Sequence, residues 1–236
     1  MTESITHRQR GPHPGILATV SLALTVAGIV IAAATSGGDA LSSPYAHDLV
    51  ARVAGNHDAV RVLAFFQFGA AVPLGILAAT FYARLVRFGV RVPGPAISLV
   101  GGVVATMSLL VAAFVTFVES RPEVTGDAAL TRALAFLAFV AGGPGYAVGV
   151  GLLVAGIAVP ALILGLVPHP LAAAGLVLAV LAELSWFGLL AQPMQYLLPI
   201  ARFGGGMWLV AAGFLMPASR PRRTPTTDEP VPEAIS

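Results

Sequence analysis

Residues 175–191 read GLVLAVLAELSWFGLLA, an apolar run that contains one charged side chain, Glu183. A helix rises about 1.5 Å per residue, so about 20 such residues cross the hydrocarbon layer of a membrane. With its flanking residues, this run predicts a membrane-spanning helix over residues 171–191. A charged side chain at the centre of such a helix costs roughly 2.5–3.5 kcal/mol on insertion, so Glu183 requires an explanation of its own.

The composition of the whole chain indicates a membrane protein. Of its 236 residues, 57% are hydrophobic and 10% are charged, and the mean hydropathy is +0.87. Because a soluble domain carries about 25% charged residues, this chain has too few charges to cover a soluble surface. The net charge of +2 gives no reason to expect nucleic-acid binding. The absence of Cys excludes disulfides and thiolate metal sites.

Five further apolar runs have spanning length, so we expect an all-α bundle of six transmembrane helices. The expected spans are residues 15–35, 62–83, 96–118, 146–167, 171–191 and 199–216. A cleaved signal peptide is a weaker interpretation of the first run, whose apolar core exceeds the usual length of about 7–15 residues.

Residues 128–141, before the fourth span, are harder to assign. The apolar piece 133–141 is too short to cross alone, and Gly142-Gly143-Pro144-Gly145 separates it from residue 146. Two interpretations stay open. The piece is an interfacial or re-entrant helix, or it is part of span four, continuous through a kink at Pro144.

The distribution of Arg predicts the orientation, because cytoplasmic loops are enriched in basic residues. With the N-terminus inside, five Arg lie outside, and eight lie inside: Arg8, Arg10, Arg84, Arg87, Arg91, Arg220, Arg222 and Arg223. We therefore expect both termini in the cytoplasm, with 1–14 as a tail, 15–217 as the membrane domain and 218–236 as a disordered tail. All basic residues are Arg, which suggests a bacterial protein of the plasma membrane.

The connection between the first two spans is expected to contain a short outer helix. Ser43 suits the N-cap, Pro44 suits the first helical position, and Gly55 suits the position just past the end. Asp48 and Arg52 stand four residues apart, so their side chains can pair across one turn.

Motifs for catalysis, metals and cofactors are absent from the sequence. His-Asp occurs twice in the first loop, but His47 and Asp58 would lie about 16 Å apart on one straight helix, too far for a common ion. The stretch GGPGYAVGVG lacks the third Gly of a dinucleotide-binding loop. Its Gly145 and Gly149 instead have the spacing of close-packed membrane helices. We expect no metal, no cofactor and no catalytic residue, and the sequence offers no basis for an enzyme.

Polar residues at similar depths of several spans predict a binding cavity in the outer half of the bundle. Cavities between helices are a usual place for ligand sites. The polar residues in question belong to spans two, five and six and to the connection between the last two. The candidate ligand-binding residues are Glu183, Arg202, Gln67, Trp186, Gln192 and Tyr196.

Three interpretations of Glu183 remain open at this point. It is tied structurally to Arg202 or to polar groups on neighbouring helices, or it binds a cationic group or carries a proton. In the third interpretation it is protonated, neutral and merely tolerated. A charged carboxylate that faces lipid without a partner is the arrangement that the insertion cost argues against.

Residues 166–175 read LVPHPLAAAG and form the expected inner turn between spans four and five. The turn resembles the L-V-P-x-x-L-A-x-x-G pattern of a family of bacterial six-helix integral membrane proteins classed only as a domain of unknown function. The order of elements is also similar over most of residues 15–217. The resemblance implies a six-helix membrane architecture and no particular activity.

Two functions are compatible with these features. The first is binding or transport of a small molecule or ion through the outer-half polar cavity. The alternative is a non-catalytic membrane subunit or scaffold, whose Gly- and Ala-rich faces bind partner helices or a second copy of the chain. The lipid bilayer is the surrounding partner in both.

Overall fold

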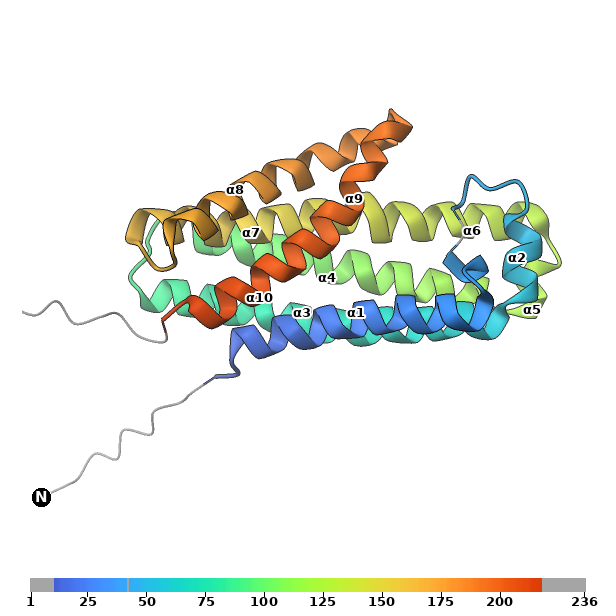
Figure 1. Ribbon diagram of the computed structural model, residues 1–236, viewed down its shortest axis with the longest axis horizontal. Helices are drawn as coiled ribbons and strands as arrows, with labels where there is room; N and C mark the ends of the chain where they lie inside the picture. The colour runs from blue at the N-terminus through green and yellow to red at the C-terminus, as the bar shows by residue number, and fades with distance from the viewer. Residues whose placement is uncertain (1–10, 42, 218–236) are drawn as a thin grey trace, which may run out of the picture.

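The computed structural model describes residues 11–41 and 43–217, and every regular element in these ranges is helical (Figure 1). Six helical stretches are long and apolar enough to cross a membrane, as expected. They are α1 (Pro14–Ser36), α3 (His57–Arg87), α4 (Gly94–Glu119), the stretch Ala128–Leu164, the stretch His169–Leu189 and the stretch Gln192–Leu215. The all-α, six-span architecture is confirmed in these respects.

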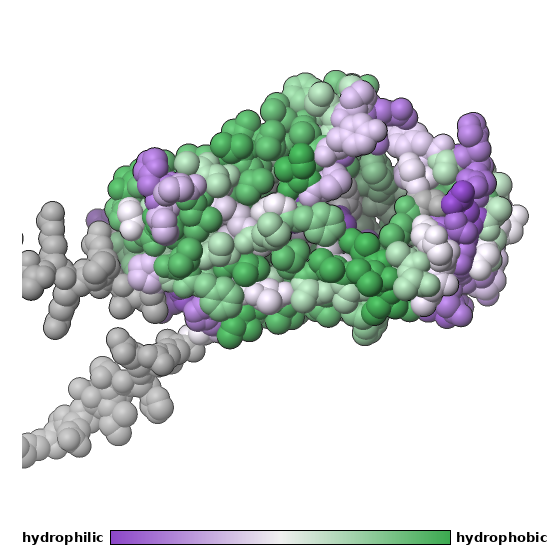
Figure 2. Space-filling model, in the orientation of Figure 1, coloured by the Kyte–Doolittle hydropathy of each residue, from purple (hydrophilic) through white to green (hydrophobic). Residues whose placement is uncertain are grey.

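The two ends of the bundle differ in what they contain. One end, which we name the α2 end, holds η1 (Asp39–Leu41), α2 (Leu49–Gly55) and α5 (Pro122–Thr125) (Figure 1). The opposite end holds the start of α1 and the end of α10 (Gly205–Leu215). Figure 2 shows hydrophobic side chains over the middle of the bundle and hydrophilic ones gathered at both ends, the distribution expected of a membrane protein.

Several expectations about the termini concern residues that the structure does not describe. The predicted disordered tail, 218–236, and most of the predicted N-terminal tail, 1–14, lie outside the described residues. Five of the eight Arg counted as cytoplasmic lie there too: Arg8, Arg10, Arg220, Arg222 and Arg223. The orientation of the bundle therefore stays a prediction.

Residues 128–164 form one continuous helical stretch, which supports the continuous interpretation of this region over the re-entrant one. It consists of α6 (Ala128–Val140), the π-helical turn η2 (Ala141–Gly145) and α7 (Tyr146–Leu164). Pro144 has no N–H to donate, and its ring would crowd the carbonyl one turn earlier. The chain accommodates it by widening to a π turn, so the helix is not broken.

The short helix expected between α1 and α3 begins later in the chain than the sequence predicts. Residues 43–48 form turns, in which the backbone N–H of Tyr45 lies 3.3 Å from the Ser43 hydroxyl, and α2 starts at Leu49. The expected start at Pro44 is therefore wrong. Since Asp48 precedes Leu49, the acid and Arg52 still stand one turn apart.

Helices α4 and α7 touch backbone to backbone through glycines. A Cβ added at Gly149 would lie 2.7 Å from the Cα of Ala105, and one added at Gly101 would lie 2.6 Å from the Cβ of Leu152. Small residues permit this approach, which provides the dispersion contacts that hold membrane helices together. The close-packing role predicted for Gly149 is therefore supported.

The last two spans form a hairpin that leans away from the rest of the bundle. Helix α8 (His169–Leu184) continues as η3 (Ser185–Leu189), and the chain returns through η4 (Gln192–Tyr196), α9 (Leu197–Pro199) and the π turn η5 (Ile200–Gly204). Near the base of the hairpin, the Trp208 indole N–H donates to the Leu171 carbonyl at 2.7 Å. Figure 1 shows the tip of the hairpin, where α8 leads into α9, standing away from the long helices α1, α3 and α4.

Replacing Gly149 with Ala is expected to destabilise the bundle by about 1–3 kcal/mol, because the added methyl meets backbone that cannot move aside. Thermal unfolding of the purified protein in detergent measures the effect. Gly55→Ala is the matched control, since a Cβ at Gly55 meets nothing within 4 Å. Equal unfolding midpoints for the two variants would contradict the close contact of α4 with α7.

Candidate functional site

A cavity of about 490 Å³ lies inside the bundle near the α2 end. Its lining residues come from the α2 end and from the last span, and include Asp39 of η1, Leu49 of α2 and Arg202 of η5. Figure 2 shows the surface hollowed between the tip of the α8–α9 hairpin and the α2 end. The volume lies within the range of about 300–1,000 Å³ that is typical of small-molecule sites.

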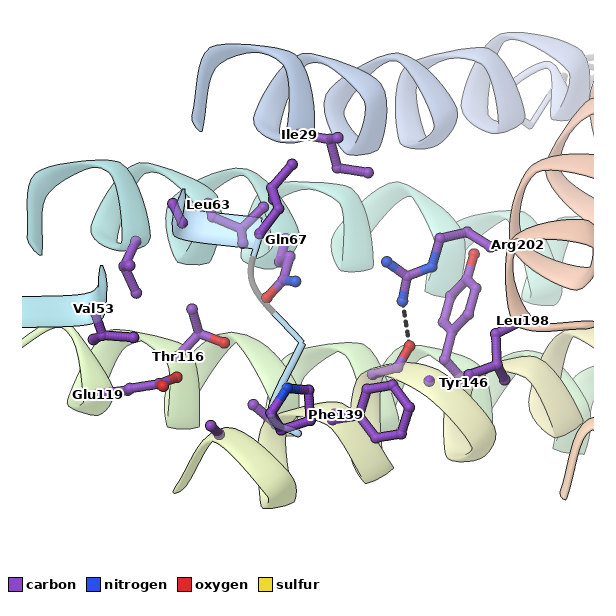
Figure 3. Close-up of a pocket in the computed structure, with 18 of the residues that line it drawn as sticks. Ile29, Val53, Leu63, Gln67, Thr116, Glu119, Phe139, Tyr146, Leu198 and Arg202 are labelled. Atoms are coloured by element: carbon purple, nitrogen blue, oxygen red, sulfur yellow. Dashed lines mark hydrogen bonds between the residues drawn. The ribbon is translucent and has the colours of Figure 1, made fainter. Parts of the chain in front are cut away.

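Most of the cavity wall is apolar, with a few polar groups at separate places. Leu63 of α3, Phe139 of α6 and Leu198 of α9 are among the apolar lining residues (Figure 3). The lining residues with polar or charged side chains are Asp39, Gln67, Thr116, Glu119, Tyr146 and Arg202. An apolar wall with a few polar groups is the usual design of a ligand pocket.

Arg202 is held over the cavity by α7 and η2. Its Nη2 donates a hydrogen bond to the carbonyl oxygen of Gly142, and its guanidinium carbon lies 4.9 Å from the centroid of the Tyr146 ring (Figure 3). No ion pair among residues 11–41 and 43–217 includes Arg202. A backbone carbonyl and an aromatic ring thus support the cation, and no carboxylate of the described chain does.

The π turn η2 removes the usual α-helical donor from the Gly142 carbonyl, which accepts from Arg202. In a regular α-helix this carbonyl would accept from the N–H of Tyr146, four residues later. Here the Tyr146 N–H points instead to the carbonyls of Ala141 and Gly143. Arg202 lies in a second π turn, η5, so its hydrogen bond to Gly142 joins the π turns η2 and η5. Single π turns inside α-helices occur frequently at functional sites.

Gln67 contributes a polar side chain from the middle of α3. Figure 3 shows it lying between Arg202 and the Thr116–Glu119 turn of α4. Its Oε1 is buried and has no hydrogen-bond partner among the described residues. A buried acceptor left in this way costs about 1–3 kcal/mol, so a partner from outside the chain would stabilise it.

Glu119 provides a buried carboxylate at the other end of the cavity. Only 6% of the residue is exposed, and none of the hydrogen bonds or ion pairs within the described ranges includes it. On the same helix, Ala112 lies at the level of Gly142, because a Cβ added at Gly142 would lie 3.0 Å from the Ala112 Cβ. Seven residues separate Ala112 from Glu119, which is about 10 Å along the axis.

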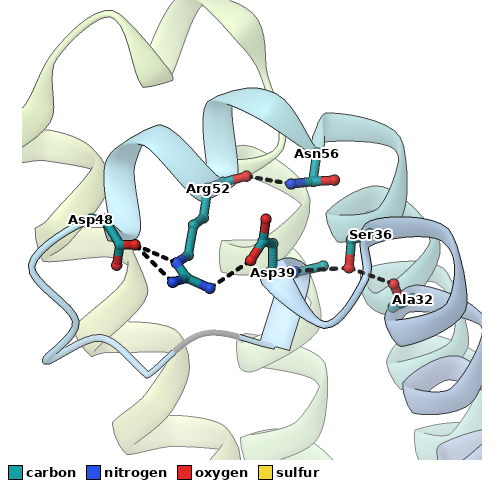
Figure 4. Close-up of polar contacts among 7 residues, drawn as sticks. Ala32, Ser36, Asp39, Asp48, Arg52 and Asn56 are labelled. Carbon is teal, nitrogen blue, oxygen red and sulfur yellow. Dashed lines mark hydrogen bonds and ion pairs between the residues drawn. The ribbon is translucent and has the colours of Figure 1, made fainter.

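Arg52 bridges η1 and α2 at the α2 end of the bundle (Figure 4). Its Nη1 lies 2.5 Å from Asp39 Oδ1, and its Nη2 lies 2.7 Å from Asp48 Oδ2. The expected Asp48–Arg52 pair is therefore present. The hydrogen bond from Arg52 holds the pKa of the Asp48 carboxyl below its usual value.

The six predicted site residues do not converge on this cavity. Gln67 and Arg202 line it, whereas Glu183, Trp186, Gln192 and Tyr196 do not. Trp186 stacks on Phe187 with 4.4 Å between the ring centroids, and Tyr196 is 81% exposed. Gln192, at the start of η4, is also exposed.

Glu183 packs in the groove between α7 and α8 and does not pair with Arg202. A Cβ added at Gly151 of α7 would lie 2.7 Å from Glu183 Oε1, so the absence of a side chain there makes room for the carboxylate. That oxygen is buried and has no hydrogen-bond partner in the described part of the chain. The predicted tie to Arg202 is absent because Arg202 donates to Gly142 instead.

Three polar lining residues, Glu119, Thr116 and Tyr146, are not among the candidates expected from the sequence. The expected third span ends at residue 118, whereas Glu119 is the last residue of α4. One signal was present in the sequence: Ala112, Thr116 and Glu119 follow the i, i+4, i+7 spacing of one helix face. That spacing places the acid on the same face as Ala112, and the structure packs this face against Gly142.

Comparison with models of known protein families, with curated proteins and with solved structures finds no match to this chain. What the fold defines is therefore a class of architecture, a six-helix bundle suited to cross a membrane several times, with a cavity of ligand size near one end.

Replacing Glu183 with Gln is expected to leave the unfolding midpoint unchanged or to raise it. The reason is that the carboxylate has a buried oxygen without a hydrogen-bond partner in the described chain, and a neutral amide costs less to bury than a charge. Thermal unfolding in detergent measures this. A midpoint lowered by several degrees would show that Glu183 makes a stabilising contact as an anion.

Proposed function

We propose that this protein binds a small amphipathic molecule in the cavity near the α2 end, and that Arg202 binds an anionic group of that molecule. The single observation that carries the proposal is a cation inside a ligand-sized cavity, with no carboxylate partner among the described residues. Burying a charge without an opposite charge is costly, so an anion that enters the cavity would be strongly favoured.

The guanidinium group suits this role by its geometry. It has five N–H donors in a planar fork, and the one hydrogen bond it donates within the described chain goes to Gly142. The remaining donors can bind a carboxylate or a phosphate through two parallel hydrogen bonds. Tyr146 lies under the guanidinium and keeps it in place from one side.

The walls indicate that the rest of the molecule is largely apolar. Leu63, Phe139 and Leu198 line the cavity and would exclude water around an apolar body. Burial of apolar surface contributes about 25 cal/mol per Å², so such a body adds affinity to the ionic contact. The same cavity would serve a transporter, in which the leaning α8–α10 hairpin is the element that moves.

A second candidate function, a membrane subunit that binds partner helices, is favoured by Glu183. This carboxylate is half-buried in the α7–α8 groove, and its buried oxygen has no partner among the described residues. A partner helix that offers a donor at that depth would satisfy it, because polar side chains associate helices within membranes.

Replacing Arg202 with Gln is expected to weaken binding of 4-phenylbutyrate by about tenfold or more, because the charge-assisted hydrogen bonds to the carboxylate are lost. Isothermal titration of the purified protein in nanodiscs measures the dissociation constant. Glu183→Gln is the matched control, since Glu183 lies outside the cavity, and it should bind like the wild type.

The uncharged analogue 4-phenylbutanol completes this experiment. It should bind the wild type and Arg202→Gln with similar, weak affinity, because it retains only the apolar contacts. The proposal is overturned if wild-type protein binds neither compound, or if Arg202→Gln binds 4-phenylbutyrate as well as the wild type.

We also propose that the protein lies in a bacterial plasma membrane with both termini in the cytoplasm, so that the α2 end faces outward. The native chain has no Cys, which allows single cysteines to report accessibility. In intact cells, Glu123→Cys should react with a membrane-impermeant maleimide, whereas exposed Arg91→Cys should react only after permeabilisation. The reverse pattern would show the opposite orientation.

A further inference from the structure

The proposed function leaves the second charge of the cavity unexplained. Glu119 lines the same cavity, is 6% exposed, and has no hydrogen-bond or ion-pair partner among the described residues. Its carboxylate lines a mostly apolar cavity, where a positive group would stabilise it. The identity of that positive group rests on the proposed function.

The described cations near the α2 end are engaged elsewhere. Arg52 bridges Asp39 and Asp48, and Arg61 pairs with Asp58 at 3.1 Å. The remaining two at this end have partners as well: Arg132 donates to the carbonyls of Ala46 and His47, and Arg121 lies 3.7 Å from Glu123. The positive group that Glu119 lacks is therefore not one of these side chains.

Arg202 and Glu119 lie at opposite ends of the cavity. Glu119 is about two helical turns, or 10 Å, beyond the level at which Arg202 contacts Gly142. Figure 3 shows the two side chains well separated, with Gln67 between them. An α-amino acid carries its two charges on a single carbon and cannot reach both groups at once.

We propose that the cavity binds an elongated zwitterion, whose anionic group lies on Arg202 and whose ammonium group lies on Glu119. The levels of the two groups along α4 differ by about 10 Å, a length that an extended tripeptide matches at about 3.3–3.6 Å per residue. A chain-like ω-amino acid of similar length carries the same two charges. The mostly apolar wall of the cavity suits either kind of body.

Gln67 is expected to distinguish between a tripeptide and an ω-amino acid as the ligand. Its side-chain amide lies between the charged ends, and its buried Oε1 has no partner among the described residues. A peptide offers an amide N–H at that position, whereas a methylene chain offers no donor. The tripeptide is therefore expected to bind more tightly than the ω-amino acid, and Gln67→Leu to remove the difference.

The test compares four probes on the full-length protein in nanodiscs by isothermal titration: tri-alanine, N-acetyl-tri-alanine, tri-alanine amide and 8-aminooctanoate. Tri-alanine should bind at least about tenfold more tightly than either blocked peptide, because each blocking group removes one ionic contact. In Glu119→Gln, tri-alanine should bind no better than N-acetyl-tri-alanine. In Arg202→Gln, it should bind no better than tri-alanine amide.

Two outcomes would overturn the inference. If 4-phenylbutyrate binds through Arg202 but tri-alanine binds no better than its N-acetyl form, the ligand is not a zwitterion bound at Glu119, and the proposed function stands. If neither 4-phenylbutyrate nor any of the four probes binds, both are wrong. The wild-type comparison of free and acetylated peptide needs no variant, so it holds even where Glu119→Gln folds poorly. Glu183→Gln, outside the cavity, is the control and should behave like the wild type.

Discussion

The close contact of α4 with α7 determines where the other parts of the cavity lie. Gly101 and Gly149 let the two backbones approach within a distance that no side chain would permit. The contact extends past the π turn, where Ala112 of α4 meets Gly142. It therefore positions both the carbonyl that accepts from Arg202 and the last turn of α4, which carries Glu119. In a bilayer, where apolar surface alone does not drive helices together, such packing is a principal source of association.

The irregular backbone at the cavity follows from the need to pair backbone polar groups inside a membrane. Within a membrane each backbone N–H and C=O needs a partner inside the protein, so a helix with an internal Pro has to redistribute its hydrogen bonds. The π turn η2 does this around Pro144 and leaves the Gly142 carbonyl to a side chain. Arg202, itself on a π turn, uses that carbonyl. The two irregular turns thus stabilise each other, and this arrangement keeps a cation inside an apolar bundle without a carboxylate of the described chain.

The sequence predicted the helical stretches well and the direction of their side chains poorly. It placed Gln67, Glu183 and Arg202 in runs of spanning length, and they lie in helical stretches long and apolar enough to cross a membrane. It did not predict that Glu183 turns toward Gly151 in the α7–α8 groove, away from the cavity. The change from α8 to the tighter η3 after Leu184 also alters the face on which Trp186 lies. Periodicity indicates which residues share a helix face, but a helix that is apolar all round gives no sign of which face meets which neighbour.

The sequence by itself determined the all-helical architecture, the six spans and the absence of cysteine chemistry, because apolar length and composition are local properties of the chain. Only the tertiary structure decided that residues 128–164 are one helical stretch, that Arg202 contacts Gly142, and that Glu119 shares a cavity with it. These depend on how glycines let particular helices approach and on how the last two spans lean. Such contacts join residues far apart in the chain, and no single segment encodes them.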